Sequence, residues 1–269
     1  MSNPQRPDAW DAGAYDLFAD ERTRPFYDLL ARVGASRPFV VVDLGCGTGS
    51  GLLTMAHRWP DAQLIGVDSS IDMLAVAATA LHGFPDVTLI HADARTWSPD
   101  TAIDVLVSNA LLQWIPDHGE LVAAMASWLG PDGWLALQVP GNFDAPSHVL
   151  LRRLAGSPQW IGQLGGALRG ADSVLDAVGY LRILRQTGLS VDAWETTYLH
   201  ELSGPEPVLR WTSGTALRPV FAVLGDQDAQ EFSGQYAELL NSAYPADETG
   251  RVLFPFRRIF AVARREENV

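Results

Sequence analysis

The chain has 269 residues, of which 47% are hydrophobic and 19% are charged, and this composition is typical of a globular protein and excludes a disordered one. Its formal net charge of -13 at pH 7 disfavours a nucleic-acid partner, because phosphate binding requires clustered cations. No apolar run is long enough to cross a bilayer and no signal peptide opens the chain, so we expect a cytoplasmic protein without a membrane partner.

Segments with strand and helix periodicity alternate along the first half of the chain. Buried-strand patterns occur at 39–44, 63–67, 87–90, 103–107 and 134–139, and helical patterns at 25–34, 50–59, 71–81 and 120–129. Strands separated by helices predict an α/β fold with a doubly wound, mostly parallel sheet. Ligands of such sheets bind beyond the carboxyl ends of the strands.

The second half of the chain interrupts this pattern with helical and glycine-rich sequence. We expect a core over residues 1–140 that begins with helices, a helical cap insertion at 141–175, and a return to the core at 176–204. A second part of the cap follows at 205–248, and 249–269 contain the last core strand. With strands near 191–198 and 256–263, the sheet is predicted to have seven strands.

A glycine-rich loop follows the first predicted strand, in the segment Asp43-Leu44-Gly45-Cys46-Gly47-Thr48-Gly49. Alternate glycines let the backbone turn tightly and approach a ligand, and the next helix offers unpaired N–H groups. A dinucleotide-binding loop needs a further glycine at position 50, where Ser50 stands, and Gly51 is out of register. The carboxylate of Asp43 would also repel a pyrophosphate, so the loop favours a cationic nucleoside.

Acidic residues also follow the next two predicted strands. Asp68 ends the second strand, where a carboxylate can accept hydrogen bonds from both ribose hydroxyls. Asp93 follows the third strand and could accept from an adenine amine, although an aspartate there can equally cap a strand end or a helix. Together with the glycine loop, these acids predict a nucleoside site.

The loop VVDLGCGTG, the turn GVDSS and the segment HADA resemble the class I S-adenosylmethionine-dependent methyltransferases, which implies their Rossmann-like fold. The resemblance covers about residues 36–140 and implies S-adenosylmethionine as cofactor, S-adenosylhomocysteine as product, and no metal. By that likeness the cofactor contacts Asp43, Gly45, Gly47 and Gly49 at the methionine part, Asp68 at the ribose, Ser69, Met73, Asp93 and Ala94 at the adenine, and Asn109 at the methionine amine. Met73 could equally be a core residue.

Less general segments resemble one branch of that family. They lie at 10–15, 21–25, 57–60, 108–118, 138–142 and 251–256, and so are spread over almost the whole chain. The branch resemblance implies esterification of a carboxylate of a small polycarboxylic acid, with trans-aconitate as the expected acceptor. One departure is Ser50-Gly51, where the branch more often has two polar residues.

Methylation of a carboxylate requires no catalytic acid or base, because the ionised carboxylate is already nucleophilic. We therefore expect residues that position the acid, with Tyr15, Trp114 and His118 at the mouth of the site. His118 could instead start a helix, since Pro116-Asp117 is typical of a helix N-terminus. The candidates for clamping the other carboxylates are the arginines Arg22, Arg24, Arg218, Arg257 and Arg258.

Three alternatives remain beside this interpretation, and the oligomeric state is open, with a monomer plausible. The chain could methylate another acid, such as malonate on an acidic carrier protein, which would need a basic docking patch. It could be a non-catalytic module that binds S-adenosylmethionine, although its large helical insertions exceed what cofactor binding requires. A nicotinamide oxidoreductase is opposed by Ser50 and Asp43.

Overall fold

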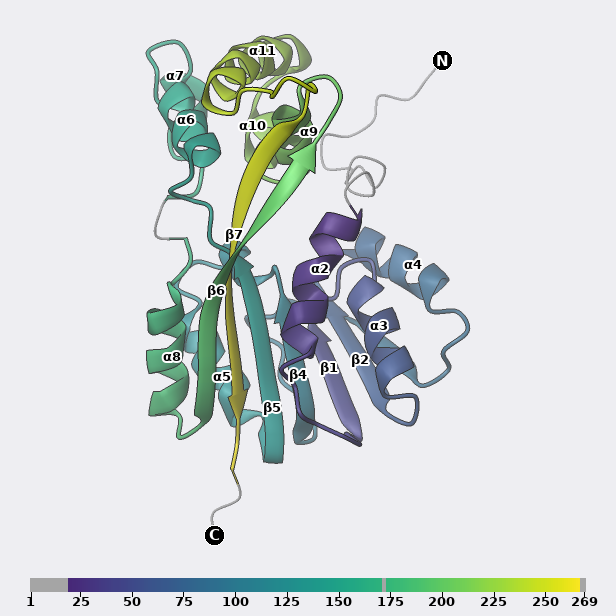
Figure 1. The fold of residues 1–269 in the computed structure, drawn as a ribbon. Helices are drawn as coiled ribbons and strands as arrows, with labels where there is room; N and C mark the ends of the chain where they lie inside the picture. The colour runs from purple at the N-terminus through teal and green to yellow at the C-terminus, as the bar shows by residue number, and fades with distance from the viewer. Residues whose placement is uncertain (1–18, 171–172, 267–269) are drawn as a thin grey trace. The chain divides into compact units, whose positions relative to one another are not determined.

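A computed structural model describes residues 19–170 and 173–266 of the chain. Within these residues seven strands form one sheet in the spatial order β3-β2-β1-β4-β5-β7-β6 (Figure 1). The strands are β1 (Val40–Leu44), β2 (Gln63–Asp68), β3 (Val87–His91), β4 (Ile103–Asn109), β5 (Leu129–Pro140), β6 (Ser190–Leu202) and β7 (Val252–Arg264). The first five pair in parallel and β7 runs antiparallel to β5, which confirms the predicted Rossmann-like sheet.

The direction of winding reverses at β1. From β1 the chain adds β2 and then β3 on one side, and it returns to place β4 on the other side of β1. Asp43 pairs with Gly66 of β2 and with Val107 of β4. Two residues further along the three parallel strands, Gly45, Asp68 and Asn109 therefore reach the same edge of the sheet, at the switch point where such folds bind ligands.

Helices alternate with the strands as the sequence pattern predicts. The helices are α2 (Ala19–Leu30), α3 (Ser50–Arg58), α4 (Ile71–Ala80), η1 (Leu112–Trp114), α5 (Gly119–Ser127), α6 (Pro146–Ala155), α7 (Ile161–Leu164), α8 (Ala177–Gln186), α9 (Pro207–Ser213), α10 (Arg218–Val223) and α11 (Asp226–Ala243). None of the helices in the described residues is long and apolar enough to span a bilayer.

The chain divides into two compact units. Within the described residues, we call 24–140, 174–196 and 258–266 the core unit, and 19–23, 141–170, 173 and 197–257 the helical unit. Two of the divisions fall at 140/141 and 173/174, and the other two fall inside β6 and β7. Both strands are longer than their sequence pattern indicates, and the structure extends them to Leu202 and back to Val252.

The core unit packs around fully buried strands. All five residues of β1 are buried, because helices cover both faces of a parallel sheet. One face carries Leu106 and Leu137, which belong to an apolar cluster with Val122 and Met125 of α5 and Leu184 of α8. Burying each such side chain contributes about 1.5–3 kcal/mol, so the strand ends that form the site are held by a rigid scaffold.

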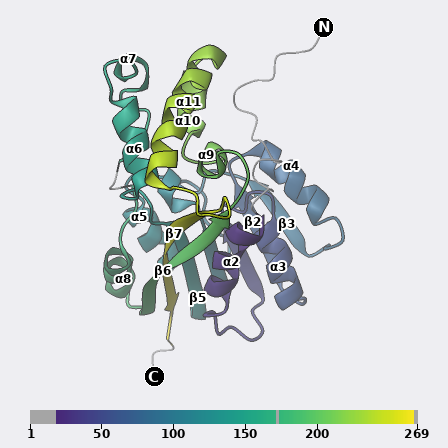
Figure 2. The same cartoon turned by 45° about the horizontal axis from the view of Figure 1, so that its top comes forward.

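The helical unit has an apolar core of its own. Trp160, Trp211 and Phe232 are almost completely buried, and the rings of Trp160 and Phe232 meet edge to face with centroids 5.4 Å apart. Helices α6 and α11 lie side by side (Figure 2). The Tyr236 hydroxyl donates to the Ser147 carbonyl at 2.8 Å, and the Tyr244 hydroxyl accepts from the Ser147 N–H at 3.1 Å. The start of α6 is thereby fixed to α11.

Candidate functional site

The turn between β1 and α3 is built on glycines with left-handed backbone angles. Gly45, Gly47 and Gly49 have φ values of 84°, 53° and 82°. A Cβ on Gly47 would meet no heavy atom within 4 Å, so the backbone there borders open space. The turn therefore gives a ligand close access to the backbone at Gly47.

Gly51 has a function that the sequence pattern did not suggest. A Cβ at this position would lie 2.7 Å from Oδ2 of Asp43 and 3.0 Å from the Phe26 ring. Real Cβ atoms essentially never show the shorter of these contacts, so α3 can pack over the Asp43 carboxyl group only if residue 51 is glycine. In the sequence, the only indication of this contact is the spacing between Asp43 and Gly51, and that spacing can be interpreted only once the fold is known.

Asp43 lies almost completely buried at the end of β1, with 3% of its surface exposed. Burial and then the nearby negative charge of Asp68 raise its pKa from 3.8 to about 7. A cation placed beside these two carboxyl groups would remove both the repulsion and part of the burial penalty. The electrostatics of this edge thus favour a positively charged ligand.

Asp68, at the end of β2, is held by two backbone N–H groups. Its Oδ2 accepts from Gly47 N at 2.9 Å and its Oδ1 accepts from Ser70 N at 2.9 Å. Each carboxylate oxygen has two lone pairs, so both can accept one further hydrogen bond. Asp68 is therefore oriented over the glycine turn with acceptor capacity to spare, as a ribose diol requires.

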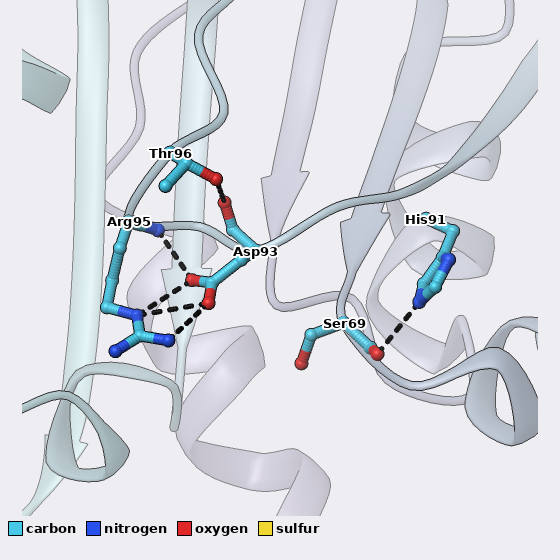
Figure 3. Close-up of polar contacts among 5 residues, drawn as sticks. All are labelled: Ser69, His91, Asp93, Arg95 and Thr96. Atoms are coloured by element: carbon cyan, nitrogen blue, oxygen red, sulfur yellow. Dashed lines mark hydrogen bonds and ion pairs between the residues drawn. The ribbon is translucent and has the colours of Figure 1, made fainter.

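The segment after β2 presents backbone and small side chains. Ser70 caps α4, because its hydroxyl accepts from Met73 N at 3.3 Å, and Met73 is half-buried in the first turn of that helix. Ser69 is exposed, and its carbonyl oxygen lies 3.0 Å from Nε2 of His91 at the end of β3 (Figure 3). The structure therefore places Ser69 and Met73 on the same turn as Asp68.

Asp93 makes a local ion pair in this structure. Its carboxylate accepts from Nε of Arg95 at 3.0 Å and from Nη2 at 2.5 Å, and the Arg95 backbone N–H also donates to it (Figure 3). The hydrogen bonds from Arg95 lower the pKa of Asp93 to about 2. The Asp93 carboxylate is therefore bound within its own loop, by the backbone and side chain of Arg95. Ala94, between these two residues, is buried.

Buried polar groups with unused hydrogen-bonding capacity lie at the ends of β4 and β5. Oδ1 of Asn109 is buried without a hydrogen-bond partner, and so is Nε2 of Gln138, the residue paired with Asn109 across the two strands. Such groups are rare in folded proteins and suggest a partner that the chain itself does not supply. Ala110 follows with a φ of 58°, a strained angle for a residue other than glycine.

The expected positioning residues fall in different surroundings. Tyr15 lies outside the described residues. Trp114 is 43% exposed on η1. His118 is buried at the start of α5, where its Nδ1 lies 3.0 Å from the Ile115 carbonyl and its Nε2 lies 2.8 Å from the Tyr180 hydroxyl. Both ring nitrogens thus have partners inside the core unit, and His118 directly precedes α5.

The expected substrate arginines have different surroundings, each within its own unit. The side chain of Arg22 lies outside the described part, and Arg24 and Arg218 are exposed. Arg257 donates from Nε to the Gly141 carbonyl at 2.7 Å and pairs with an aspartate of its own unit, which gives it a structural role. Arg258 is buried in the core unit, with its Nη1 3.5 Å from Oε1 of Gln138.

S-adenosylmethionine fits the residues at this edge of the core unit. The open space before Gly47 accommodates a ligand against the backbone, and Asp68 offers acceptors for a diol. The unpartnered Oδ1 of Asn109 can accept from an amine, and the raised pKa of Asp43 favours a cation. Each of these features matches a different part of the cofactor.

Comparison with known sequences also indicates a methyltransferase. Residues 41–133 match the family model described as "Methyltransferase domain". The trans-aconitate 2-methyltransferase of Streptomyces avermitilis is 49% identical over 98% of this chain and 99% of its own length. The enzyme of that name from Streptomyces coelicolor is 48% identical over 98% of this chain and 89% of its own length, and that from Mycobacterium tuberculosis is 44% identical over 94% and 96%.

Solved structures support the fold. The YcgJ protein from Bacillus subtilis superposes with a TM-score of 0.59 at 16% identity, over 90% of this chain and 98% of that one. Phosphoethanolamine N-methyltransferase 2 of Haemonchus contortus, solved with S-adenosylhomocysteine, superposes with a TM-score of 0.52 at 18% identity, over 90% and 52%. These likenesses extend to nearly the whole chain.

Proposed function

Because the chain belongs to the trans-aconitate 2-methyltransferase family, we propose that it transfers a methyl group from S-adenosylmethionine to a carboxylate of trans-aconitate. The observation that carries this proposal is the identity of 44–49% to relatives of that name over nearly the full length of both chains. The likeness includes the helical unit, which a generic methyltransferase domain would not share, since the domain match itself covers residues 41–133.

The chemistry is a displacement at carbon. A carboxylate oxygen attacks the methyl carbon, the carbon–sulfur bond breaks, and its electron pair stays on sulfur, which gives a methyl ester and S-adenosylhomocysteine. The negative oxygen and the positive sulfonium are both neutralised, so a site that excludes water favours the reaction. Holding the reacting atoms about 3 Å apart can contribute roughly 7–11 kcal/mol through orientation alone.

The residues of the core unit would bind and orient the donor in this reaction. Asp68 would accept from the ribose hydroxyls, Asn109 would accept from the methionine amine, and Asp43 would stabilise the cation. Gly47 would let the methionine part lie against the backbone. Arg258, buried on β7 beside Gln138 of β5, is our candidate in this unit for binding the acceptor. We expect the reaction in the cytoplasm.

The test is turnover with a methyl-labelled donor. We expect the purified chain to esterify trans-aconitate, identified by mass spectrometry, with a higher kcat/KM than for cis-aconitate, citrate or a monocarboxylate. If label enters malonyl carrier protein and not trans-aconitate, the acceptor is the alternative acid. If the donor binds and no acid in the panel is methylated, the chain is a non-catalytic binding module.

A further inference from the structure

A pocket inside the helical unit carries two arginines, and none of its lining residues is among those assigned above to the cofactor. The pocket is partly open, and the figure of about 270 Å³ for its empty space includes the open solvent at its mouth. Arg152, Arg169 and His148 line it together with Phe143, and leucines such as Leu151 complete its wall. None of the described residues that line the pocket is acidic, although the whole chain has a net charge of -13.

Both guanidinium groups are positioned around Phe143. Nη2 of Arg152 donates to the Phe143 carbonyl at 2.6 Å, and the guanidinium carbon of Arg169 lies over the Phe143 ring, 5.4 Å from its centroid. His148 meets the same ring edge to face, with centroids 5.3 Å apart. Ser147, tied to α11 by Tyr236, fixes the helix that carries His148 and Arg152. The cations of the pocket are therefore preorganised.

The charge of the pocket at neutral pH comes from its arginines. Burial lowers the pKa of Arg169 to about 10, so this side chain stays charged at pH 7. Burial and then the charges of Arg169 and Arg152 lower the pKa of His148 to about 4, so the imidazole is neutral. Asp144 is close enough to raise that pKa, but its carboxylate is 70% exposed and pairs with Arg257 at 3.2 Å.

From this geometry we propose that the Arg152–Arg169 pocket binds a small polycarboxylate anion. Two fixed guanidinium groups present planar pairs of N–H donors, which match carboxylates better than any other common anion except phosphate. A guanidinium has five N–H donors and can bind a carboxylate while it keeps its existing contacts. The neutral His148 can donate or accept, and Phe143 and the leucines accommodate the carbon skeleton of the acid.

The ligand class follows from the pocket and does not depend on the proposed function. If trans-aconitate is the acceptor, its carboxylates that are not esterified are the first candidates for this pocket. A second acid molecule that regulates the enzyme would present the same chemistry. Kinetics distinguish the two sources, since loss of acceptor binding raises KM while loss of a separate effector changes the number of acid molecules bound.

The experiment is calorimetric titration of the full chain with trans-aconitate, with acetate and inorganic phosphate as comparison anions. We expect Arg152→Gln and Arg169→Gln each to weaken trans-aconitate binding at least tenfold. The matched control is Arg153→Gln, because Arg153 is the exposed neighbour of Arg152 on the same helix. This control should bind within twofold of the unmodified chain, and S-adenosylmethionine affinity should be unchanged in all three variants.

The outcomes separate this proposal from the proposed function. If trans-aconitate is not methylated but binds, and both glutamine variants lose binding, the pocket assignment stands alone. Unchanged trans-aconitate binding in both variants overturns it, whatever the enzyme methylates, and tighter binding of phosphate than of trans-aconitate overturns the ligand class. If Arg152→Gln fails to fold because it loses the Phe143 carbonyl contact, Arg169→Lys keeps a charge without the planar fork and should bind about tenfold more weakly.

Discussion

The strand edge of the core unit and the pocket of the helical unit have opposite electrostatics. At the strand edge two carboxyl groups, Asp43 and Asp68, lie close enough for one to raise the pKa of the other. In the pocket two arginines, Arg152 and Arg169, lower the pKa of His148. A reaction that transfers a methyl group from a sulfonium to a carboxylate needs a site for a cation and a site for an anion. We propose the strand edge for the cation and the Arg152–Arg169 pocket for the acceptor carboxylates that are not esterified.

The net charge of the chain alone does not reveal this division. A protein of charge -13 repels a polyanion at long range, so an acidic substrate has to be held by local cations. The strand edge with Asp43 and Asp68 needs no local cations, because the ligand we expect there is itself a cation. Four substitutions test this difference between the two regions, from the largest expected effect to the smallest.

Asp68→Asn should have the largest effect. The amide cannot accept at both oxygen positions, and its NH2 group would face either the Gly47 or the Ser70 N–H. Loss of about two charge-assisted hydrogen bonds predicts roughly 100-fold weaker S-adenosylmethionine binding by calorimetry. Asp72→Asn, in the exposed first turn of α4, is the matched control. Affinity within threefold of the unmodified chain would show that Asp68 does not bind the cofactor.

Asp43→Asn should reduce S-adenosylmethionine affinity about tenfold at pH 8, since one pKa unit of interaction corresponds to a factor of ten. The folded-state pKa of about 7 lies above the ordinary 3.8, so Asp43 favours folding below 3.8 and this contribution is lost as the pH rises through 7. The variant should therefore be more stable than the unmodified chain at pH 8, by on the order of 2 kcal/mol.

Urea unfolding at several pH values measures this stability difference, and calorimetry measures the affinity. The advantage of the variant should shrink as the pH falls toward 3.8. The affinity of the unmodified chain should rise between pH 6 and pH 8 more steeply than that of the variant, because only the unmodified chain has to ionise Asp43. Parallel pH profiles would contradict the assignment of a cation to this edge.

Gly47→Ala and Gly188→Ala form a matched pair. Both glycines have a left-handed backbone, with φ of 53° and 81°, and a Cβ on either meets no atom within 4 Å. Each substitution should therefore cost about 1–2 kcal/mol of stability through backbone strain. Gly47→Ala alone should also weaken S-adenosylmethionine binding, about tenfold, because the methyl group enters the space before the glycine turn. Equal affinities would show that the cofactor lies elsewhere.

Arg257→Ala should have the smallest effect, although it removes an arginine of the helical unit. Arg257 binds the Gly141 carbonyl and the exposed carboxylate of Asp144, and its side chain is 36% exposed. We expect a stability loss on the order of 1 kcal/mol in thermal unfolding and a KM for trans-aconitate within twofold. A large rise in the KM for trans-aconitate would indicate that the acid is bound by Arg257 and not by the Arg152–Arg169 pocket.

The cofactor edge was far more predictable from the sequence than the anion site. The glycine turn, Asp43 and Asp68 lie at the ends of local strand patterns, and parallel strands bring their ends to one edge by topology alone. The Arg152–Arg169 pocket instead joins α6 to residues 168–169 and 216–219. No periodicity links those segments, so the sequence could suggest arginines only by their neighbours in the chain. The side chain of Arg257 donates to the Gly141 carbonyl, a contact that the sequence pattern does not indicate.

Contacts between residues that are far apart in the sequence explain two features that the sequence pattern could not predict. His118 has the sequence position of a helix start, and its ring contacts both the nearby Ile115 carbonyl and the hydroxyl of Tyr180, a distant residue on α8. Gly51 appeared out of register until α3 placed it against Asp43. Tyr180, for His118, and Asp43, for Gly51, are each more than five residues away in the sequence, so these contacts can be identified only in the folded chain.

The most direct test of the division of charge is a crossed binding measurement. S-adenosylmethionine and trans-aconitate are each titrated into Asp68→Asn and Arg169→Gln. We predict that Asp68→Asn loses S-adenosylmethionine binding and keeps trans-aconitate binding within twofold, while Arg169→Gln shows the reverse. If Arg169→Gln weakens both ligands equally, or Asp68→Asn leaves S-adenosylmethionine binding unchanged, the assignment of the cation and the anion to separate units is contradicted.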